Sequence, residues 1–423
     1  MKKVVVTGIG AVTPLGSTFI ESWETLKTGQ IGTDILTRFD TDGIPWKIAG
    51  ELKDFDAGRY LSRKETNRLD PFVHYAVAAA IMAVEDAGLT EQPAQRIRRK
   101  GIPIPDTGHS AYLKTSGVII GSSRGGISTI ERELIKLKTS NIKISAYLMP
   151  STTTSMAASY IAQKLGISGH CLGISNACAS GTNAIGEAYR LIKSGFHGPV
   201  LCGGTEAPLC RICIIGYGNA GALSRAKNAS AGRPFDKSRD GFVLSEGACI
   251  LVLEEYEHAL DRGASIYGEI AGYGNTTDAY HMTIPNPDGE AKAILLSLRE
   301  GLIEPEEVRY INAHGTATKL GDAAETRAIK LAFGKSARGI PVSSVKSMTG
   351  HMLAASGAFE TAVTLMSMKE GTITPTLNLQ EPDPDCDLRH ITKPERGDIS
   401  ISITNSFGFG GVNAVLALRR FPS

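Results

Sequence analysis

The sequence predicts an α/β protein, and two recurring patterns lead to this prediction. Short apolar runs such as 118–120 (Val-Ile-Ile) and 310–312 (Tyr-Ile-Asn) alternate with alanine-rich stretches that have helical spacing. Runs of this length are typical of buried strands, whereas the alanine-rich stretches are long enough to form helices. The alternation therefore predicts helices layered on a sheet of buried, mostly parallel strands.

Individual elements follow from the same patterns. Residues 70–87 have helical spacing and are apolar on more than one side, and Gly88 is a stop signal. A first strand over 4–6 is expected to turn at Gly8-Ile9-Gly10, and 172–195 reads as a strand, a turn and a helix. Further strands are expected over 116–121, 199–201, 247–253, 310–312 and 399–403.

Composition limits the functional class. The 423 residues are 42% hydrophobic and 21% charged, with a formal net charge of +2, which is ordinary for a globular protein and gives no case for nucleic-acid binding. No apolar run is long enough for a membrane span, and the apolar start of the chain is broken by Gly8 and Gly10, as in a buried strand rather than a signal peptide. We therefore expect a cytoplasmic protein.

Two local patterns carry less information. Seven dispersed cysteines predict reduced thiols, and the C-x-x-C spacing at 210–213 has no second ligand pair, so no metal site is expected. The stretch 90–115 includes a basic run at 96–100 and lacks periodicity. It is interpreted as a solvated surface loop, with a docking patch for an acidic partner as the alternative.

The glycines at the start of the chain resemble a dinucleotide-binding fingerprint but do not match it. The third glycine of G-x-G-x-x-G would fall at Thr13, and Pro14 follows where a helix should continue. Binding of NAD or FAD is therefore not expected.

A first chemical segment is centred on Cys178. It lies in 176–181 (Asn-Ala-Cys-Ala-Ser-Gly), between the expected strand and the expected helix of the unit 172–195. A cysteine at a helix N-terminus gains from unpaired N–H groups and the helix dipole, which lower the thiol pKa and favour the nucleophilic thiolate. A buried structural cysteine is an equally good reading of this segment alone.

A second segment, 312–318, places His314 where an expected strand leads into a Gly/Thr turn. A histidine at such a place can face a cleft, although a core histidine is the more frequent case. The acidic residues Asp322 and Glu325 follow within a short distance and could orient a cationic partner.

A third segment combines His351 with a lysine and a glutamate. His351 precedes an alanine-rich helical stretch, so the helix N-terminus is expected to disfavour its protonated form. A neutral imidazole can donate a hydrogen bond from Nε2. Lys346 and Glu360 flank this histidine at spacings that allow a buried ion pair, although Lys346 could equally lie on the surface.

A fourth segment, 405–413, contains three glycines around an aromatic residue: Gly408-Phe409-Gly410-Gly411. Backbone of this kind can turn tightly and can aim an N–H group at a developing oxyanion. A tight turn with a core aromatic is the alternative. Each segment is weak by itself, but one cysteine, two histidines and a lysine in this order form a strong set.

With these four segments the sequence resembles the β-ketoacyl-acyl-carrier-protein synthases, specifically the elongating type II group. The resemblance extends over nearly the whole chain, from 6–10 (Val-Thr-Gly-Ile-Gly) to Gly411, and includes 233–243 and 278–283. It implies a thiolase fold, in which two similar βαβαβαββ halves stack as five αβαβα layers. The expected halves are 1–260, with the cysteine, and 261–423, with both histidines and the glycine-rich loop.

The resemblance also implies roles. Cys178 would receive the acyl chain as a thioester, and His314 and His351 would bind the malonyl carbonyl and stabilise the enolate left by decarboxylation. Backbone N–H groups of Cys178 and Phe409 would form an oxyanion hole, with Phe409 as a gate. The implied substrate-binding residues are Thr316, Thr318, Arg124, Thr283, Phe407, Gly408 and Gly410, and the implied supporting residues are Lys346, Glu360, Asp322 and Glu325.

Partners and cofactors are implied as well. The acyl chains would arrive on the phosphopantetheine arm of acyl carrier protein, with Lys64 and Arg68 at the docking surface, and no metal or redox cofactor would be needed. The family forms dimers, either of identical chains or with a ketosynthase-like partner. No nucleic acid and no membrane is expected as a partner.

Two departures from the family pattern bear on the substrate. The position of Arg124 is usually apolar in the fatty-acid enzymes, and an arginine in an apolar tunnel is costly unless it is paired, which suggests a shortened, rerouted or more polar acyl pocket. Gly221 stands where a basic docking residue is usual. These departures favour a specialised polyketide ketosynthase working with a chain-length-factor partner, whereas residues 405–411 favour fatty-acid elongation.

A third reading is a subunit that keeps the fold without the reaction. The presence of Cys178, His314, His351 and Lys346 argues against such a scaffold.

Overall fold

The computed structural model describes residues 2–90, 111–140 and 144–421. The predicted basic run 96–100, and most of the loop expected over 90–115, lie outside the described residues. Within the described residues, no helix is both long and apolar enough to cross a membrane.

Within the described residues, the strands form one large sheet and two small ones. They are β1 (Val4–Val12), β2 (Asp34–Ile35), β3 (Ile48–Ala49), β4 (Gly117–Gly121), β5 (Cys171–Ile174), β6 (Val200–Glu206), β7 (Gly247–Glu255), β8 (Gly268–Thr277), β9 (Tyr310–Asn312), β10 (Pro341–Ser343), β11 (Thr372–Ile373), β12 (Arg389–His390), β13 (Glu395–Arg396), β14 (Ile401–Gly408) and β15 (Val412–Arg419).

Helices separate most of these strands along the chain. They are α1 (Phe19–Lys27), α2 (Arg63–Arg68), α3 (Pro71–Asp86), α4 (Ala111–Lys114), α5 (Ile127–Ser140), α6 (Leu148–Thr152), α7 (Met156–Leu165), α8 (Ser180–Lys193), α9 (Arg211–Asn219), α10 (Tyr256–Asp261), α11 (Pro287–Glu300), α12 (Lys319–Phe333), α13 (Lys346–Thr349) and α14 (Ala354–Glu370).

The large sheet contains the same succession of pairings twice. From β1 the order is β7 and β6, both antiparallel, followed by β4 and β5, both parallel. From β8 the order is β15 and β14, both antiparallel, followed by β9 and β10, both parallel. Three residue pairs between β1 and β8 join the two sets into one eleven-stranded sheet. This internal repeat is the thiolase fold that the resemblance implied.

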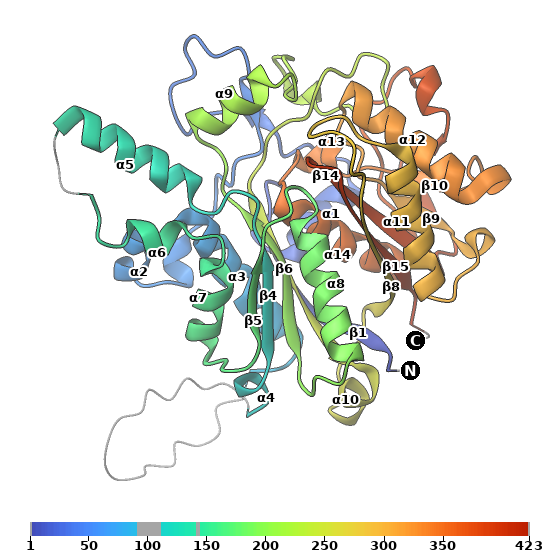
Figure 1. Cartoon of the computed structure of the whole chain (residues 1–423), viewed down its shortest axis with the longest axis horizontal. Helices are drawn as coiled ribbons and strands as arrows, with labels where there is room; N and C mark the ends of the chain where they lie inside the picture. Colours follow the sequence, from blue (N-terminus) through green and yellow to red (C-terminus); the bar gives the residue numbers. More distant parts are fainter. Residues whose placement is uncertain (1, 91–110, 141–143, 422–423) are drawn as a thin grey trace.

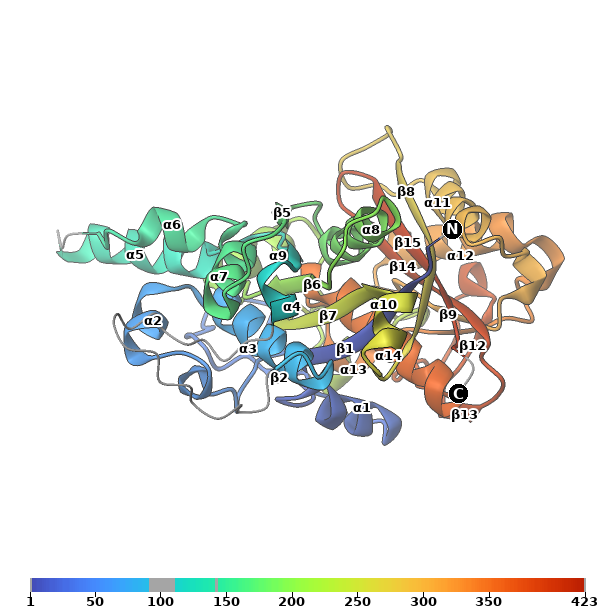
Figure 2. The ribbon, with the colours of Figure 1, turned by 90° about the horizontal axis from the view of Figure 1, so that it is seen from below.

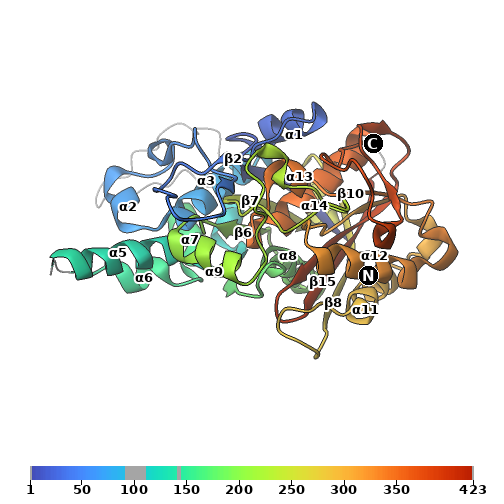
Figure 3. The same cartoon turned by 90° about the horizontal axis from the view of Figure 1, so that it is seen from above.

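Helices complete five layers, which Figure 1 shows in order across the molecule. Helices α3 and α7 pack on the first set of strands, α8 and α14 pack together between the two sets, and α11 and α12 cover the second. Figure 3 shows the first set, with the blue and green segments, on one side of the molecule and the orange and red segments on the other. The predicted boundary between residues 260 and 261 stays a prediction. Helix α14 from the second half packs on β6 and β7 of the first half, so the two halves share a core.

Most of the predicted elements are found where expected. Asp70 accepts a hydrogen bond from Phe72 N–H and caps α3, and Pro71 occupies the first helical position, so this helix begins as the sequence indicates. Helix α5 extends away from the rest of the molecule, with α6 beside it (Figure 2).

Two expectations about the sheet were wrong. Its pairings are half antiparallel, because β14 and β15 are joined by a tight turn and β1 lies antiparallel to both of its neighbours. The chain also does not turn at Gly8 and Gly10, which lie within β1. A Cβ at Gly10 would lie 2.1 Å from the backbone oxygen of Ala79 in α3, so the glycine permits close helix–sheet packing.

Candidate active site

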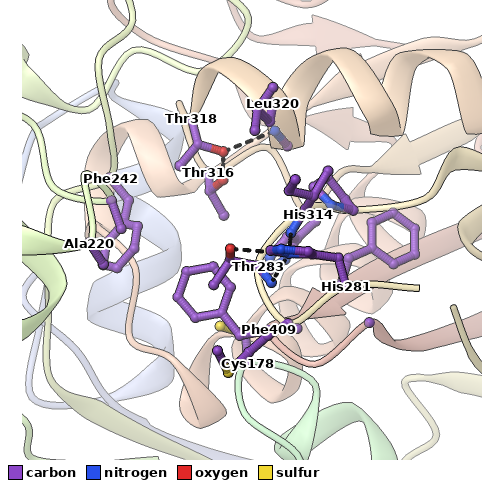
Figure 4. A pocket seen from close by; sticks show the side chains of 18 of the residues that line it. Cys178, Ala220, Phe242, His281, Thr283, His314, Thr316, Thr318, Leu320 and Phe409 are labelled. Atoms are coloured by element: carbon purple, nitrogen blue, oxygen red, sulfur yellow. Dashed lines mark hydrogen bonds between the residues drawn. The ribbon is translucent and has the colours of Figure 1, made fainter. Parts of the chain in front are cut away.

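A pocket lies beyond the carboxyl ends of β5, β9 and β14, where several of the predicted residues meet. It has a volume of about 260 Å³ and is lined by Cys178, His314 and His351 together with Thr283, Thr316, Thr318, Phe407, Gly408 and Phe409. In Figure 4, Cys178 lies beside Phe409, and Thr316 and Thr318 lie on the opposite side of the pocket. Residues more than two hundred positions apart in the chain thus share one site.

Cys178 lies on a sharp turn between β5 and α8. Ala177, which precedes it, has φ of 46°, a conformation that L-residues other than Asn and Asp rarely adopt. The Ser180 hydroxyl stabilises this turn, because it accepts from Asn176 N–H at 2.8 Å and donates to the Ala177 carbonyl at 2.6 Å. The turn presents the cysteine to the pocket.

The predicted lowering of the Cys178 pKa is wrong. Burial of the sulfur raises the pKa to about 11, and the opposing effects of the Lys346 charge and the Phe409 backbone do not overcome it. Cys178 also lies two residues before α8, so the helix dipole is weaker there than at the first turn. The resting group is therefore a thiol.

His351 contacts that thiol directly. Its Nε2 lies 3.1 Å from Cys178 Sγ, and its Nδ1 lies 3.1 Å from the hydroxyl of Ser356. Its backbone N–H donates to the Val243 carbonyl at 2.7 Å, and the ring of Phe242 meets the imidazole edge-on at 5.1 Å. Three groups therefore contact the ring, and the backbone bond fixes the residue that carries it.

His314 forms the other side of the cluster. Its ring centre lies 5.4 Å from that of His351, at an angle of 83°. Among the described residues its buried Nδ1 has no hydrogen-bond partner. The carboxylate of Glu325 accepts from the backbone N–H groups of His314 and Gly315 at 2.8 and 2.7 Å, which places the histidine at the end of β9.

Both histidines are neutral at physiological pH. Burial lowers the pKa of His314 and of His351 well below the usual value, and the charge of Lys346 lowers both further. The lowered pKa predicted for His351 agrees with the structure, but burial of the ring is the main cause. The thiol of Cys178 and the imidazoles of His314 and His351 are therefore all uncharged.

Lys346 and Glu360 form an ion pair that is almost fully buried. The pair lies behind the histidines and not in the pocket lining. Because a buried charge is costly without a partner, Glu360 allows Lys346 to keep a positive charge close to the imidazoles.

Asp322, the other acidic residue predicted to support the site, contacts backbone groups and an arginine outside the pocket lining. It accepts from the backbone N–H groups of Phe235 and Ala317, at 2.7 and 3.1 Å, and lies 3.5 Å from Arg239 Nε. Burial raises its pKa to about 7. Asp322 therefore fixes the loop that carries Thr316 and Thr318, whose hydroxyls lie 3.1 Å apart.

The glycine-rich loop between β14 and β15 contacts the cysteine through its backbone. A Cβ at Gly408 would lie 3.3 Å from Cys178 N, and the backbone of Phe409 forms a hydrogen bond with the Cys178 side chain that lowers its pKa. Gly410 has φ of 88° and donates from N–H to the Met282 carbonyl at 2.8 Å. The loop thereby joins the cysteine to the segment that holds Thr283.

Thr283 lies at the rim of the pocket. Its N–H donates to Nδ1 of His281 at 3.1 Å, and its hydroxyl lies 3.5 Å from the same nitrogen (Figure 4). Phe407 is buried against His314, with ring centres 6.0 Å apart.

Besides Lys346 and Glu360, the predicted residues outside the pocket lining are Asp322, Glu325, Gly410, Lys64, Arg68 and Arg124. Lys64 and Arg68 lie on α2, where Lys64 is exposed and the Arg68 guanidinium stacks on Tyr147 at 4.2 Å. Arg124 lies after β4, and its Nε donates to the Tyr217 hydroxyl at 2.8 Å. These contacts leave docking by Lys64 and Arg68 as a prediction.

Three residues that shape the site were not predicted from the sequence. Ser356 hydrogen-bonds His351, Phe242 packs on it, and Glu206 accepts from the N–H groups of Ser123 and Arg124 at 2.8 and 2.9 Å. Ser356 lies five positions after His351, and that proximity was the available signal. Nothing in the local sequence marks Phe242 or Glu206.

Comparison with known proteins agrees with this geometry. Residues 1–259 match the N-terminal domain and 267–380 the C-terminal domain of β-ketoacyl synthases. The chain is 44% identical to 3-oxoacyl-acyl-carrier-protein synthase 2 of Synechocystis sp., over 99% of this chain and 98% of that protein. It is 41% identical to the synthase of the same name from Staphylococcus aureus, over 100% of this chain and 99% of that protein.

A solved structure is similar over the same extent. The ishigamide ketosynthase/chain length factor superposes with a TM-score of 0.90 at 34% identity and covers 100% of both chains. The resemblance inferred from the four segments is thus confirmed over the full length. The chain belongs to the β-ketoacyl synthase family and is a condensing acyltransferase.

Proposed function

We propose that this enzyme transfers an acyl chain from acyl carrier protein to Cys178, decarboxylates malonyl-acyl-carrier-protein and joins the two as a β-ketoacyl thioester, as in fatty-acid elongation. The observation that carries the proposal is the contact of 3.1 Å between His351 Nε2 and Cys178 Sγ, with the His314 ring facing His351 in the same pocket. A nucleophile and two neutral donors at one point are what this reaction needs.

The first step is acyl transfer. The sulfur of Cys178 attacks the thioester carbonyl, the bond from that carbon to the pantetheine sulfur breaks, and the thiol proton ends on the departing sulfur. His351, whose Nε2 hydrogen faces the Cys178 sulfur, stabilises the negative charge that develops on this sulfur as its proton leaves. Because burial raises the thiol pKa to about 11, the proton has to leave as attack proceeds and not beforehand.

The second step is decarboxylation. Carbon dioxide leaves the malonyl group, and the electron pair of the broken bond moves into an enolate whose oxygen accepts hydrogen bonds from His314 and His351. Neutral imidazoles suit this role, since each can donate from Nε2, and the low pKa values of both keep them neutral. Ser356 supports this state of His351: when its hydroxyl donates to Nδ1, the ring hydrogen lies on Nε2.

The third step is condensation. The enolate carbon attacks the acyl carbonyl on Cys178, and the collapse of the tetrahedral intermediate releases the sulfur as a thiolate that takes up a proton. The N–H groups of Cys178 and Phe409 would stabilise the oxyanion, a role supported by the position of Gly408 against Cys178 N and by the Phe409 contact with the sulfur.

The pantetheine arm would lie along the threonine side of the pocket. Thr316 and Thr318 offer hydroxyls there, and Thr283 lies at the rim. Lys64 and Arg68 would attract the acidic surface of the carrier. The chemistry is redox-neutral, so no cofactor is required, and the seven free thiols suit a reducing cytoplasm.

The β5 edge of the large sheet is a suitable surface for dimer formation. Strand β5 is its last strand, and Cys171 and Leu172 on it are exposed. An unpaired edge with exposed apolar side chains is a surface that a second chain can cover. Light scattering would report the dimer, and a monomer at micromolar concentration would contradict it.

A specialised polyketide ketosynthase is the second candidate. It is favoured by Arg124 and by the likeness to the ketosynthase/chain length factor structure. The deciding experiment incubates the purified chain with acyl-carrier-protein thioesters of graded length and with malonyl-carrier-protein, and follows adducts and products by mass spectrometry. Long saturated adducts on Cys178 that become β-ketoacyl products support elongation. Turnover only with an added partner subunit supports the second candidate.

A further inference from the structure

Arg124 and Tyr217 form a polar pair in an otherwise apolar cluster. Besides the bond from Arg124 Nε to the Tyr217 hydroxyl, the guanidinium carbon lies 5.2 Å from the centre of the tyrosine ring. Tyr217 is buried, whereas Arg124 is exposed in the single chain. Among the described residues, only Nε of the guanidinium has a hydrogen-bond partner. The terminal nitrogens are thus available as donors.

This pair lies directly beyond the reactive cysteine. The Tyr217 ring is 6.5 Å from the ring of Phe409 and 5.6 Å from that of Phe242. Cys178 and Phe409 pack against the same apolar cluster that includes Tyr217. Cys178, Phe242 and Phe409 line the pocket, whereas neither Arg124 nor Tyr217 does. An acyl group on Cys178 that extends past Phe409 therefore meets Tyr217 and Arg124.

The backbone holds Arg124 in this place independently of the tyrosine. Glu206, at the end of β6, accepts from the N–H groups of Ser123 and Arg124, and Ser122 accepts from Gly125 N–H at 3.1 Å. The turn after β4 is therefore fixed from within, so the backbone of Arg124 keeps a place from which its side chain reaches Tyr217.

The physical consequence is a preference among acyl chains. A saturated chain laid along the guanidinium would displace water from its free N–H groups and return no hydrogen bond, which is unfavourable. A chain with a keto, hydroxyl or carboxylate oxygen at that depth would accept from those groups, and hydrogen bonds to a charged donor are the stronger kind.

We propose that the Arg124–Tyr217 pair is the specificity determinant of the acyl site, and that it selects short acyl groups and oxygen-bearing acyl chains against long saturated ones. This inference rests on the condensing reaction that both candidate functions share, because it names the acyl groups that Cys178 receives. Arg124 acts as a donor to the acyl chain, and Tyr217 positions the guanidinium.

The test measures the rate of Cys178 acylation by mass spectrometry, with matched thioesters of acyl carrier protein. Acetyl, hexanoyl and dodecanoyl groups vary the length, and hexanoyl is compared with its oxygen-bearing analogue 5-oxohexanoyl. The wild type is expected to favour 5-oxohexanoyl over hexanoyl by on the order of tenfold, and to acylate slowly with dodecanoyl.

Two variants test how much Arg124 and Tyr217 each contribute to the acyl-chain preference. Arg124→Ile is expected to abolish the preference for the oxygen-bearing chain and to raise dodecanoyl acylation by about tenfold. Tyr217→Phe retains the ring but removes the hydroxyl, and is expected to weaken the preference without raising dodecanoyl acylation as much. Arg190→Ile is the matched control, because the Arg190 guanidinium stacks on Tyr273 at 4.6 Å and lies on α8 away from the pocket lining. Its profile should equal that of the wild type.

The outcomes separate this inference from the proposed function. If no thioester acylates Cys178 and malonyl-carrier-protein is not decarboxylated, the proposed function fails. If the wild type acylates and condenses but takes dodecanoyl as fast as 5-oxohexanoyl, the specificity inference is overturned while the function stands. An unchanged profile in Arg124→Ile overturns it equally.

Discussion

The Nε2 atom of His351 lies 3.1 Å from the sulfur of Cys178, and both groups are uncharged in the resting enzyme. Burial raises the pKa of the thiol and lowers the pKa of the imidazole, so an ion pair of thiolate and imidazolium is disfavoured from both sides. In the proposed reaction the nucleophile is therefore formed during attack, and the two histidines remain able to donate hydrogen bonds to an enolate.

Replacing the nucleophile should separate the two half-reactions. Cys178→Ala is expected to abolish condensation but to leave measurable decarboxylation of malonyl-carrier-protein, because His314 and His351 remain. Product analysis by mass spectrometry checks both. The control is Cys202→Ala, which removes another buried thiol in β6. Normal condensation by Cys178→Ala would refute its role as nucleophile.

The two histidines should each be required for decarboxylation. His314→Ala or His351→Ala removes a donor to the enolate and is expected to slow carbon dioxide release by on the order of a hundredfold or more. The exposed His197, changed to alanine, serves as the control. A variant that still releases carbon dioxide at the wild-type rate would exclude that histidine from the step.

Alkylation of Cys178 should report its raised pKa. Only the thiolate reacts, and with a pKa of about 11 its fraction rises about tenfold per pH unit until that pH is approached. The rate with iodoacetamide is therefore expected to keep rising above pH 9, where a free cysteine with a pKa of about 8.5 has levelled off. Cys171→Ser removes the exposed thiol that would compete. A plateau near pH 8 would contradict the burial effect.

The charge of Lys346 should set the acid limit of decarboxylation. Lys346 lowers the pKa of both histidines, so its removal raises those values and moves the acid limb of the pH–rate profile toward neutral pH. The double variant Lys346→Met with Glu360→Gln avoids an unpaired buried charge. Lys346→Met alone is expected to lose about 3–5 kcal/mol of stability, measured by urea unfolding. An acid limb that does not move in the double variant would show that Lys346 has a packing role only.

The glycine in β1 should matter for packing. Gly10→Ala would place a Cβ against the backbone of α3 and is expected to lower the free energy of unfolding by about 1–3 kcal/mol. Gly397→Ala is the control, since a Cβ at Gly397 has nothing within 4 Å. Equal unfolding midpoints in urea for the two variants would show that the strand and helix can separate without cost.

The sequence by itself determined most of the elements and pointed to the groups that we propose as reactive. Capping by Asp70 and Pro71, the apolar runs and the order of Cys178, His314, Lys346 and His351 are local or linear features, so they can be read before folding. The family and its repeat of two halves followed from that order.

The tertiary structure alone decided how these groups behave. Local sequence predicted a lowered thiol pKa at Cys178, but surrounding protein from distant segments removes water from the sulfur and raises the pKa instead. The pairing of Arg124 with Tyr217 and the packing of Gly10 on Ala79 also join residues far apart in the chain. Such effects depend on distance and desolvation in space, which spacing along the chain does not specify.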